Sequence, residues 1–396
     1  MFDAANTTVL SHRQPAKELR PASAPSSGPT ANQPKRITIG TELSPAVSRY
    51  PSRIEDQDDE RRAEAINLGG LARLARTAQR GLVDFVALDD TAMGNPPYSA
   101  RRRGALDAVR LATRLAKATE GIQLLPAVNA SRAEASSLVP ALVELEVASE
   151  GRHAWELVLP ELTPAAGQQS TEVLAATVED TWSDSPALTA TAASARALRQ
   201  QRLGEAAGSA AFSAPPTLVM RANDDYAIGL AARQASVVRT QVVNKADAAK
   251  QRRDLRALAA DAGRNPDDVK TLVDLSITLS TESGLAEARK DLAEEMTGVE
   301  LGDGQARFVG HPDDLAEFCV DWVQDEACDG FTVRPTSLPI DLRLMVDMVI
   351  PALQTAGHIA STYSRSSPHL TAPRAVPVPQ ASAPLALSAN PEDYWD

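Results

Sequence analysis

The stretch LARTAQRGLVDFVALDDTAM (74–93) contains the unit from which most of the chain is built. Its first residues end a helix expected over 60–80, in which apolar side chains recur at helical spacing. Gly81 follows directly, in the usual place of a helix-ending residue with positive φ. LVDFVAL (82–88) is a nearly continuous apolar run, which is typical of a strand buried on both faces. A helix, a tight turn and a buried strand therefore follow one another here.

The same alternation of apolar strands and helices recurs along the chain. Strands are predicted at 37–43, 82–88, 121–128, 154–159, 217–220, 236–241, 272–280 and 331–335. The helices are predicted at 60–80, 106–119, 134–148, 171–182, 224–234, 245–262, 313–327 and 341–356. Strands buried on both faces need helices outside the sheet, and this number of units favours a closed α/β fold, the (β/α)8 TIM barrel. No Gly-x-Gly-x-x-Gly motif follows the first strand, which argues against an open dinucleotide-binding sheet.

Composition divides the chain into one domain and two tails. Residues 1–35 and 360–396 are rich in Ala, Ser and Pro and poor in apolar periodicity, which predicts disordered termini. The barrel is expected over 36–359. A low-complexity segment at 183–214 interrupts the pattern after the fourth strand, and we interpret it as an insertion at the barrel mouth.

The composition also excludes several classes of function. A formal net charge of −12 argues against a nucleic-acid or anionic-membrane surface, because both need a basic stripe. No apolar run approaches the roughly 20 residues that span a bilayer, and no signal-peptide pattern begins the chain. The cysteines are Cys319 and Cys328, and no Cys/His cluster has metal-ligand spacing. We therefore expect reduced thiols, no metal site and a cytoplasmic protein.

Three segments resemble the bacterial-luciferase-like flavin monooxygenases, most closely the branch that acts on nitrilotriacetate, dibenzothiophene sulfone and similar substrates. The first segment is 74–93, and the second joins GIQLLPAV (121–128) to LVELEVASEGRHAWELVL (142–159). The third is a C-terminal block made of GLAARQASVV (229–238), GRNPDDVKTL (263–272), FVGHPDDLAEF (308–318), DGFTVRPTSLP (329–339) and MVIPALQTAG (348–357). The order and spacing of these segments are specific for the fold and less specific for the activity.

The resemblance implies a cofactor, a reaction and partners. Members of the family hold FMN, which a separate flavin reductase delivers in reduced form, and use it with O2 on a small organic substrate. The protein binds the ring, anchors the phosphate and excludes water. Relatives in the wider family use a deazaflavin instead, and a homodimer is possible. Since the sites of such barrels lie at the carboxyl ends of the strands, the candidate residues are sought there.

The ends of the second and third strands supply two candidates. Asp89 matches the acidic position that the family places beside the flavin; alternatively, Asp89 or Asp90 caps the following loop. After the third strand, a family threonine that reaches the flavin corresponds to Ala127, so that Asn129 and Ser131 keep the polar groups. The resemblance thus implies a flavin site that has lost part of its hydroxyl lining.

The end of the fifth strand departs from the family most clearly. There the family has Gly-Ala-Ser at a helix N-terminus, where free N–H groups receive the flavin phosphate. This chain has Ala222-Asn223-Asp224-Asp225, which places two carboxylates where a dianion would lie. Asp224 is therefore either part of an altered cofactor site or simply the N-cap of that helix.

Three arginines are expected at the same end of the barrel. Arg221 ends the fifth strand, Arg239 lies near the end of the sixth, and Arg334 lies in the eighth. Arginine is unusual in a barrel strand, because burying an unpaired charge is costly. One interpretation pairs the three arginines with Asp90, Asp224 and Glu42. The other makes them an anion site for a relocated phosphate or an acidic substrate.

Two functions remain open at this point. The first is a flavin-dependent monooxygenase with an altered FMN or deazaflavin site, for which Asp89, Asn129, Arg221, Asp224, Arg239 and Arg334 are the candidate cofactor-binding residues. The second is a barrel that has lost its flavin and serves as a binding or scaffold protein, since a fold does not prove a chemistry. No histidine is a credible general base and no catalytic residue is assigned.

Overall fold

The computed structural model describes residues 34–43, 57–88, 107–130, 133–158, 174–181, 184–186, 216–298, 300, 304–363 and 370. Its strands run β1 (Thr38–Glu42), β2 (Phe85–Leu88), β3 (Gln123–Asn129), β4 (Ala154–Val158), β5 (Thr217–Arg221), β6 (Val237–Thr240), β7 (Lys270–Leu279), β8 (Ala306–Gly310) and β9 (Gly330–Pro335). The helices are α1 (Gln57–Arg80), α2 (Asp107–Ala116), α3 (Ala135–Ser149), α6 (Asp225–Gln234), α7 (Lys245–Asp261), α8 (Leu285–Thr297), α9 (Pro312–Gln324), α10 (Leu338–Leu344) and α11 (Ile350–Thr355), with a further helix over 174–181.

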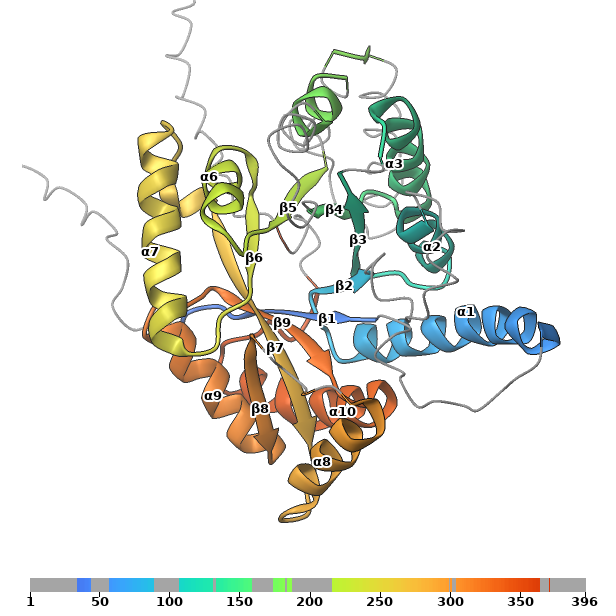
Figure 1. Ribbon diagram of the computed structural model, residues 1–396, viewed down its shortest axis with the longest axis vertical. Coiled ribbons are helices and arrows are strands. Elements are labelled where there is room, and N and C mark those ends of the chain that lie inside the picture. Colours follow the sequence, from blue (N-terminus) through green and yellow to red (C-terminus); the bar gives the residue numbers. More distant parts are fainter. Residues whose placement is uncertain are drawn as a thin grey trace, which may run out of the picture. The chain divides into compact units, whose positions relative to one another are not determined.

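Eight of the strands close into a parallel barrel with helices outside it (Figure 1), which confirms the predicted fold class. Each strand from β1 to β6 pairs with the next, and β6 pairs with β7. β9 then lies between β7 and β1, and the pairs Thr38↔Gly330 and Leu272↔Gly330 close the ring. Short apolar strands suit this arrangement, because helices cover the outer face and side chains fill the lumen.

A ninth strand and the helix before it were not predicted from the sequence. β7 is long enough to continue beyond the barrel: Lys270–Val273 pair with β6, and Leu275–Leu279 pair with β8. β9 pairs with one edge of β7 over Leu272–Ile277. On the opposite edge, β6 pairs with the first part of β7 and β8 pairs with the second part. The crossover from β7 to β8 is helix α8, so this unit extends one wall of the barrel at the carboxyl ends of its strands.

The lower half of the lumen, at the amino ends of the strands, is apolar. A cluster of fully buried side chains fills it, formed by Phe85, Ala87, Leu125, Ala154, Val219, Val237, Leu272 and Leu370. Gly40 leaves the space that the Phe85 ring occupies, since a Cβ at residue 40 would overlap that ring. This layer closes one end of the barrel, so a ligand site is left to the other end.

Two described residues of the C-terminal segment, which is predicted to be a tail from residue 360, make contacts with the barrel. The hydroxyl of Tyr363 donates to the carbonyl oxygens of Gln79 and Val83, at 3.0 and 3.1 Å. Leu370 is completely buried in the apolar layer, and its backbone N–H donates to Gln123 Oε1 at 3.0 Å. These residues therefore belong to the barrel, because apolar burial and backbone hydrogen bonds hold them there. Residues 1–33, 364–369 and 371–396 of the predicted tails and most of the predicted 183–214 insertion lie outside the described residues.

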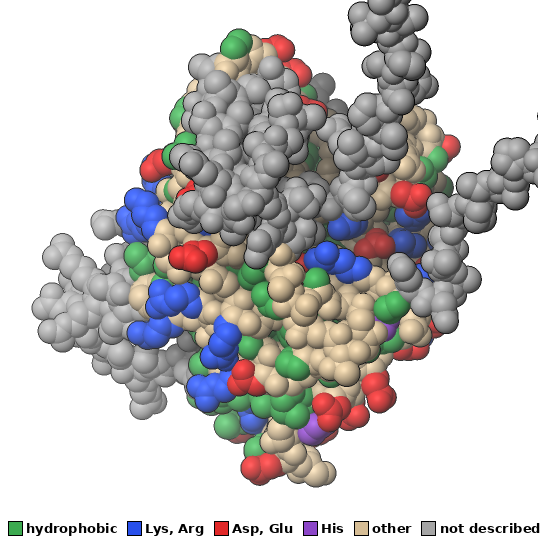
Figure 2. Space-filling model, turned by 180° about the vertical axis from the view of Figure 1, so that it is seen from behind, with side chains coloured by type: hydrophobic (Ala, Val, Ile, Leu, Met, Phe, Trp, Pro, Cys, Tyr) green, Lys and Arg blue, Asp and Glu red, His purple; other side chains and the backbone are tan. Residues whose placement is uncertain are grey.

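Surface features agree with the composition where they can be seen. The described part of the face in Figure 2 shows acidic, basic and apolar side chains interspersed with one another. Among the helices that the structure describes, none is both long and apolar enough to cross a membrane.

Candidate functional site

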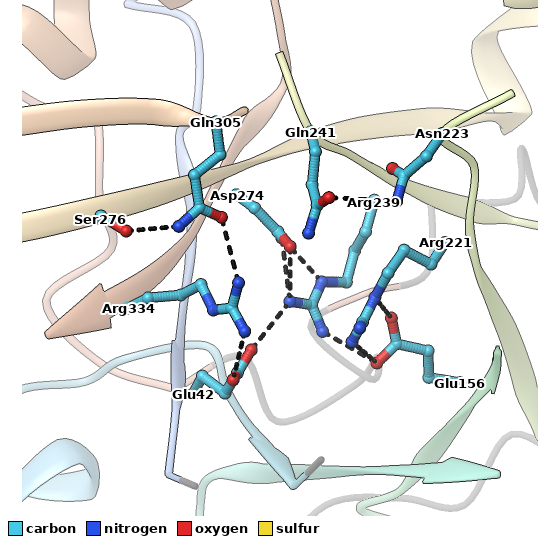
Figure 3. A network of polar contacts seen from close by, with 10 residues as sticks. All are labelled: Glu42, Glu156, Arg221, Asn223, Arg239, Gln241, Asp274, Ser276, Gln305 and Arg334. Atoms are coloured by element: carbon cyan, nitrogen blue, oxygen red, sulfur yellow. Dashed lines mark hydrogen bonds and ion pairs between the residues drawn. The ribbon is translucent and has the colours of Figure 1, made fainter. Parts of the chain in front are cut away.

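The carboxyl-end half of the lumen is filled by charged side chains (Figure 3). Side chains alternate between the two faces of a strand, so inward positions of different strands form layers across the barrel. One such layer contains Glu42 from β1, Glu156 from β4, Arg221 from β5, Arg239 from β6, Asp274 from β7 and Arg334 from β9. We call these six residues the ionic layer. It lies directly above the apolar layer and forms the floor of the barrel mouth.

Arg239 is the centre of the ionic layer. Its Nε donates to Asp274 Oδ1 at 2.9 Å, and its Nη1 donates to Glu156 Oε2 at 2.8 Å. Its Nη2 donates to Glu42 Oε2 at 3.1 Å and to Asp274 Oδ2 at 3.0 Å. The side chain is completely buried. Burial alone lowers the pKa of the guanidinium, but attraction from Asp274 and Glu156 outweighs it and raises the pKa above its ordinary value.

Arg221 and Arg334 flank this centre. Arg221 holds Glu156 with two hydrogen bonds, at 3.2 Å from Nε and 3.3 Å from Nη2. Arg334 donates to Glu42 Oε1 at 3.1 Å and to Gln305 Oε1 at 3.0 Å. Glu156 and Glu42 thus each bridge two arginines, and the three arginines balance the three carboxylates of the layer. The side chains of Arg221 and Arg334 are 12% and 24% exposed, so these two border the mouth.

Neutral amides lie on the mouth side of the ionic layer. Asn223 Nδ2 donates to Gln241 Oε1 at 3.2 Å, and Gln305 connects Arg334 to Ser276. Gln305 belongs to the segment that leads into β8, so the unpredicted strand places it above the barrel. These groups can donate and accept hydrogen bonds without carrying charge, which suits a neutral polar ligand.

Helix α6 begins next to this mouth, directly after β5. Asp224 is its N-cap, and Oδ1 of that residue accepts a hydrogen bond from the backbone N–H of Ala227 at 2.7 Å. This confirms the capping interpretation of Asp224. Asp225 follows in the first turn, and both side chains are exposed. The carboxylate of Asp224 thus accepts one of the N–H groups that could otherwise bind an external anion at this helix start.

The predicted site residues have different outcomes. Arg221, Arg239 and Arg334 do come together, and Glu42 is a partner of two of them, as predicted. The predicted pairing with Asp224 is wrong, because that carboxylate caps α6 and the partners are Glu156 and Asp274 instead. Asn129 ends β3 opposite Val158, at the mouth level of the lumen. Asp89, Asp90 and Ser131 lie outside the described residues.

Sequence reasoning missed two carboxylates of the ionic layer and the three amides Asn223, Gln241 and Gln305 on its mouth side. Asp274 stands within the apolar run LVDLSITLS, and Glu156 within AWELVL. An acid inside a strand buried on both faces is itself a signal, because a buried charge needs a partner. Gln305 gave no such signal, since it lies between predicted elements. A search for acids inside apolar strands would have found the two carboxylates and none of the amides.

The two cysteines take no part in this site. Both are free and buried, Cys319 in α9 and Cys328 before β9, which confirms the prediction of reduced buried thiols. Burial raises the pKa of the Cys328 thiol to about 12 and raises the pKa of Cys319 as well.

Comparisons with curated proteins give two short matches, and no family model matches the chain. The N-acetyl-S-(2-succino)cysteine monooxygenase of Bacillus subtilis (strain 168) is 42% identical over 60 residues, which are 15% of this chain and 14% of that protein. Component A of the nitrilotriacetate monooxygenase of Aminobacter aminovorans is 33% identical over 69 residues, 17% of this chain and 15% of that protein. The matches therefore span about one seventh of each relative.

Comparisons with solved structures cover most of the chain. The EDTA monooxygenase of Chelativorans sp. BNC1 superposes with a TM-score of 0.65 at 19% identity, over 85% of this chain and 98% of that one. The oxygenating constituent of the Pseudomonas putida 3,6-diketocamphane monooxygenase, solved with FMN, gives 0.54 at 13% identity, over 80% and 98%. A coenzyme F420-dependent tetrahydromethanopterin reductase of Methanopyrus kandleri gives 0.51 at 14% identity, over 80% and 99%. The chain therefore has the fold of the bacterial-luciferase-like monooxygenases, as the resemblance in its sequence implied.

Proposed function

We propose that the protein is a flavin-dependent oxidoreductase of the monooxygenase type, which uses a reduced flavin, FMN or a deazaflavin, with O2 on a small organic substrate. The observation that supports this most is the superposition on the EDTA monooxygenase over 98% of that protein's length. Of the solved structures compared above, one holds FMN and another depends on F420, and both share the barrel. A separate flavin reductase is the partner that this function requires.

The mouth fits the ring of a flavin better than its phosphate. The amides of Asn223 and Gln241 can exchange hydrogen bonds with the neutral polar edge of an isoalloxazine ring. The ionic layer below is fixed by mutual hydrogen bonds, so it forms a rigid floor that closes the lumen to water. The start of α6, in contrast, already holds the carboxylate of Asp224.

This chain's residues then have three roles. Asn223, Gln241 and Asn129 line and orient the ring, and Asp89 is proposed beside it. Arg239 holds the floor together through Glu42, Glu156 and Asp274. Arg221 and Arg334 join that floor to the mouth and are the charged groups nearest to a bound ligand. When bound, a reduced flavin supplies the electrons and the reaction with oxygen.

Flavin binding by the full-length chain tests this function directly. We expect FMN, anaerobically reduced FMN or F420 to change the flavin fluorescence or release heat on titration, with saturation. Asp89→Ala is expected to weaken that binding without changing the unfolding temperature, since residues at the ends of barrel strands serve function more than stability. Absence of binding by all three ligands contradicts the proposal, and unchanged binding by the variant removes Asp89 from the site.

A second candidate function is a barrel without flavin that acts as a binding or scaffold protein. It is favoured by Arg239, whose guanidinium is held by Glu42, Glu156 and Asp274, and by Asp224, whose carboxylate caps the start of α6. The same titration separates the two functions, because this one predicts a folded chain that binds none of the three ligands. A possible homodimer is tested by light scattering after size-exclusion chromatography.

A further inference from the structure

The apolar layer at the amino end of the lumen contains one residue that comes from outside the barrel strands. The other members of this layer lie on strands β2 to β7, and they are Phe85, Ala87, Leu125, Ala154, Val219, Val237 and Leu272. Leu370 belongs to the segment that follows α11, and it is completely buried among them. Strand side chains usually fill the interior of such a barrel by themselves. The lumen of this protein therefore also holds a side chain that the C-terminal segment supplies.

The strands leave room for that side chain. At the level of the apolar layer, Gly40 of β1 pairs with Phe85, and Gly330 of β9 pairs with Leu272. Paired residues of neighbouring strands belong to the same level of the barrel, so β1 and β9 contribute no side chain where their neighbours contribute Phe and Leu. The Phe85 ring takes the space next to Gly40, and Leu370 completes the cross-section.

The main chain of Leu370 is held as well as its side chain. Its backbone N–H donates to Gln123 Oε1 at 3.0 Å. Gln123 begins β3 and is only 1% exposed, so this hydrogen bond lies in the interior. Most buried backbone N–H groups are satisfied by carbonyl oxygens within a helix or sheet, whereas a side-chain amide accepts this one. A pocket for a side chain, combined with a hydrogen bond to the main chain, is how proteins commonly bind a peptide segment.

We propose that the amino end of the lumen is a peptide-binding site, which takes a leucine-sized aliphatic side chain together with the backbone N–H of the same residue, and which the chain's own Leu370 occupies. The apolar pocket selects the side chain, and Gln123 holds the main chain. Val237 of the pocket precedes Arg239 by two residues on β6, so the bound side chain lies beneath the ionic layer. This site is at the opposite end of the lumen from the proposed flavin site and does not depend on it.

A synthetic peptide of residues 366–374 tests the proposal. The receptors are full-length chains with Leu370→Gly or Leu370→Ala, in which the chain's own side chain no longer fills the pocket. We expect the fluorescently labelled peptide to bind both variants with saturation, as measured by anisotropy. The unaltered chain should bind it at least about tenfold more weakly, because the tethered Leu370 competes at high effective concentration. A peptide with Leu370→Ala should also bind at least about tenfold more weakly, because it buries fewer methyl and methylene groups.

N-methylation of the peptide at residue 370 isolates the main-chain contact. It removes the N–H that Gln123 accepts, and we expect it to weaken binding about tenfold. In a receptor that also carries Gln123→Met, the unmethylated peptide should already bind more weakly, and N-methylation should have little further effect. Gln324→Met is the matched control, because Gln324 is an exposed glutamine at the end of α9. The full effect of N-methylation should remain in that receptor.

Hydrogen exchange in the unaltered chain gives a measurement that does not depend on the folding of the pocket variants. The backbone N–H of Leu370 should exchange slowly, and Gln123→Met should accelerate its exchange about tenfold. An unprotected Leu370 N–H in the unaltered chain overturns the proposal. So does a failure of the peptide to bind Leu370 variants that circular dichroism shows to be folded. Equal weakening by N-methylation in the Gln123→Met receptor and in its control overturns it as well.

Discussion

The two halves of the barrel lumen are built from opposite chemistry on the same strands. At the amino ends, Phe85, Leu125, Val237 and Leu272 pack with Leu370 in an apolar layer. At the carboxyl ends, the ionic layer fills the same cross-section with arginines and carboxylates. β6 contributes Val237 to the first layer and Arg239, two residues later, to the second.

The difference shows how much stability each half of the lumen loses when a single side chain is removed. An apolar layer gains stability from every methylene it buries and tolerates the loss of one member in proportion to the volume lost. An ionic layer has a high desolvation cost that only complete pairing offsets, so the loss of one central charge leaves others buried and unpaired. The following substitutions test that contrast.

Arg239→Met should have the largest effect. It leaves Glu42, Glu156 and Asp274 close together without their common partner, and breaking a buried ion pair costs roughly 3–5 kcal/mol. Urea unfolding of the variant and of the unaltered chain measures the loss. Arg334→Met is the comparison, because Glu42 keeps Arg239 in that variant. Equal losses in the two variants would contradict the central role of Arg239.

Leu370→Ala should come next. The side chain is completely buried in the apolar layer, and a Leu→Ala change at such a position costs about 2–5 kcal/mol. Leu258→Ala on α7 is the matched control, because Leu258 is 41% exposed and should change stability by no more than about 0.5 kcal/mol. A truncation after residue 364 should lose as much as Leu370→Ala. If the truncated chain unfolds at the same urea concentration as the full chain, Leu370 does not stabilise the barrel.

Gly40→Ala should have a smaller effect at the boundary between the layers. The added methyl group overlaps the Phe85 ring, and overpacking of this kind costs about 1–3 kcal/mol. Gly69→Ala is the control, since a Cβ there meets no neighbouring atom and Ala favours the helix. Thermal unfolding compares the pair. A stabilised Gly40→Ala variant would show that the apolar layer has unused volume.

The smallest effect is expected for thiol reagents. The thiolate is the reactive form, and burial raises the pKa of Cys328 to about 12 and that of Cys319 as well, so both remain thiols near pH 8. A disulfide reagent should therefore label neither cysteine in the folded chain and both cysteines after unfolding in urea. Rapid labelling of Cys328 in the native state would mean that the amino end of the barrel opens to solvent.

The barrel could be predicted because its signal is local. The buried strand at 82–88 and its counterparts alternate with amphipathic helices, and few folds are compatible with that alternation. Strand β8 and helix α8 were missed because both are weakly buried: Arg307–Gly310 are partly or wholly exposed, and Ala286 is the one buried residue among those of α8 whose burial is described. Elements that pack on the outside of a barrel give a weak periodic signal.

The ionic layer could be predicted only in part. Arginines in apolar strands show from the sequence alone that partners must exist, and Glu42 was found in this way. The choice of Glu156 and Asp274 depends on which positions of separate strands share a layer. Register across the whole barrel decides that, as in the pairs Arg221↔Arg239 and Asp274↔Thr332. Sequence spacing within one strand does not contain this information.

The ion pair between Arg334 and Glu42 has a consequence for the order in which the chain folds. The two residues are 292 positions apart, and they meet only where β9 closes against β1. Contacts of such long sequence separation form late, because the entropy of closing the loop opposes them first. The entropy of closing this loop therefore opposes early completion of the ionic layer, and Glu42 lacks its Arg334 partner in any chain whose β1 and β9 have not yet met. The pairing of β1 with β9 and the pairing of Glu42 with Arg334 therefore occur together. A barrel that stays open is less stable because it lacks both.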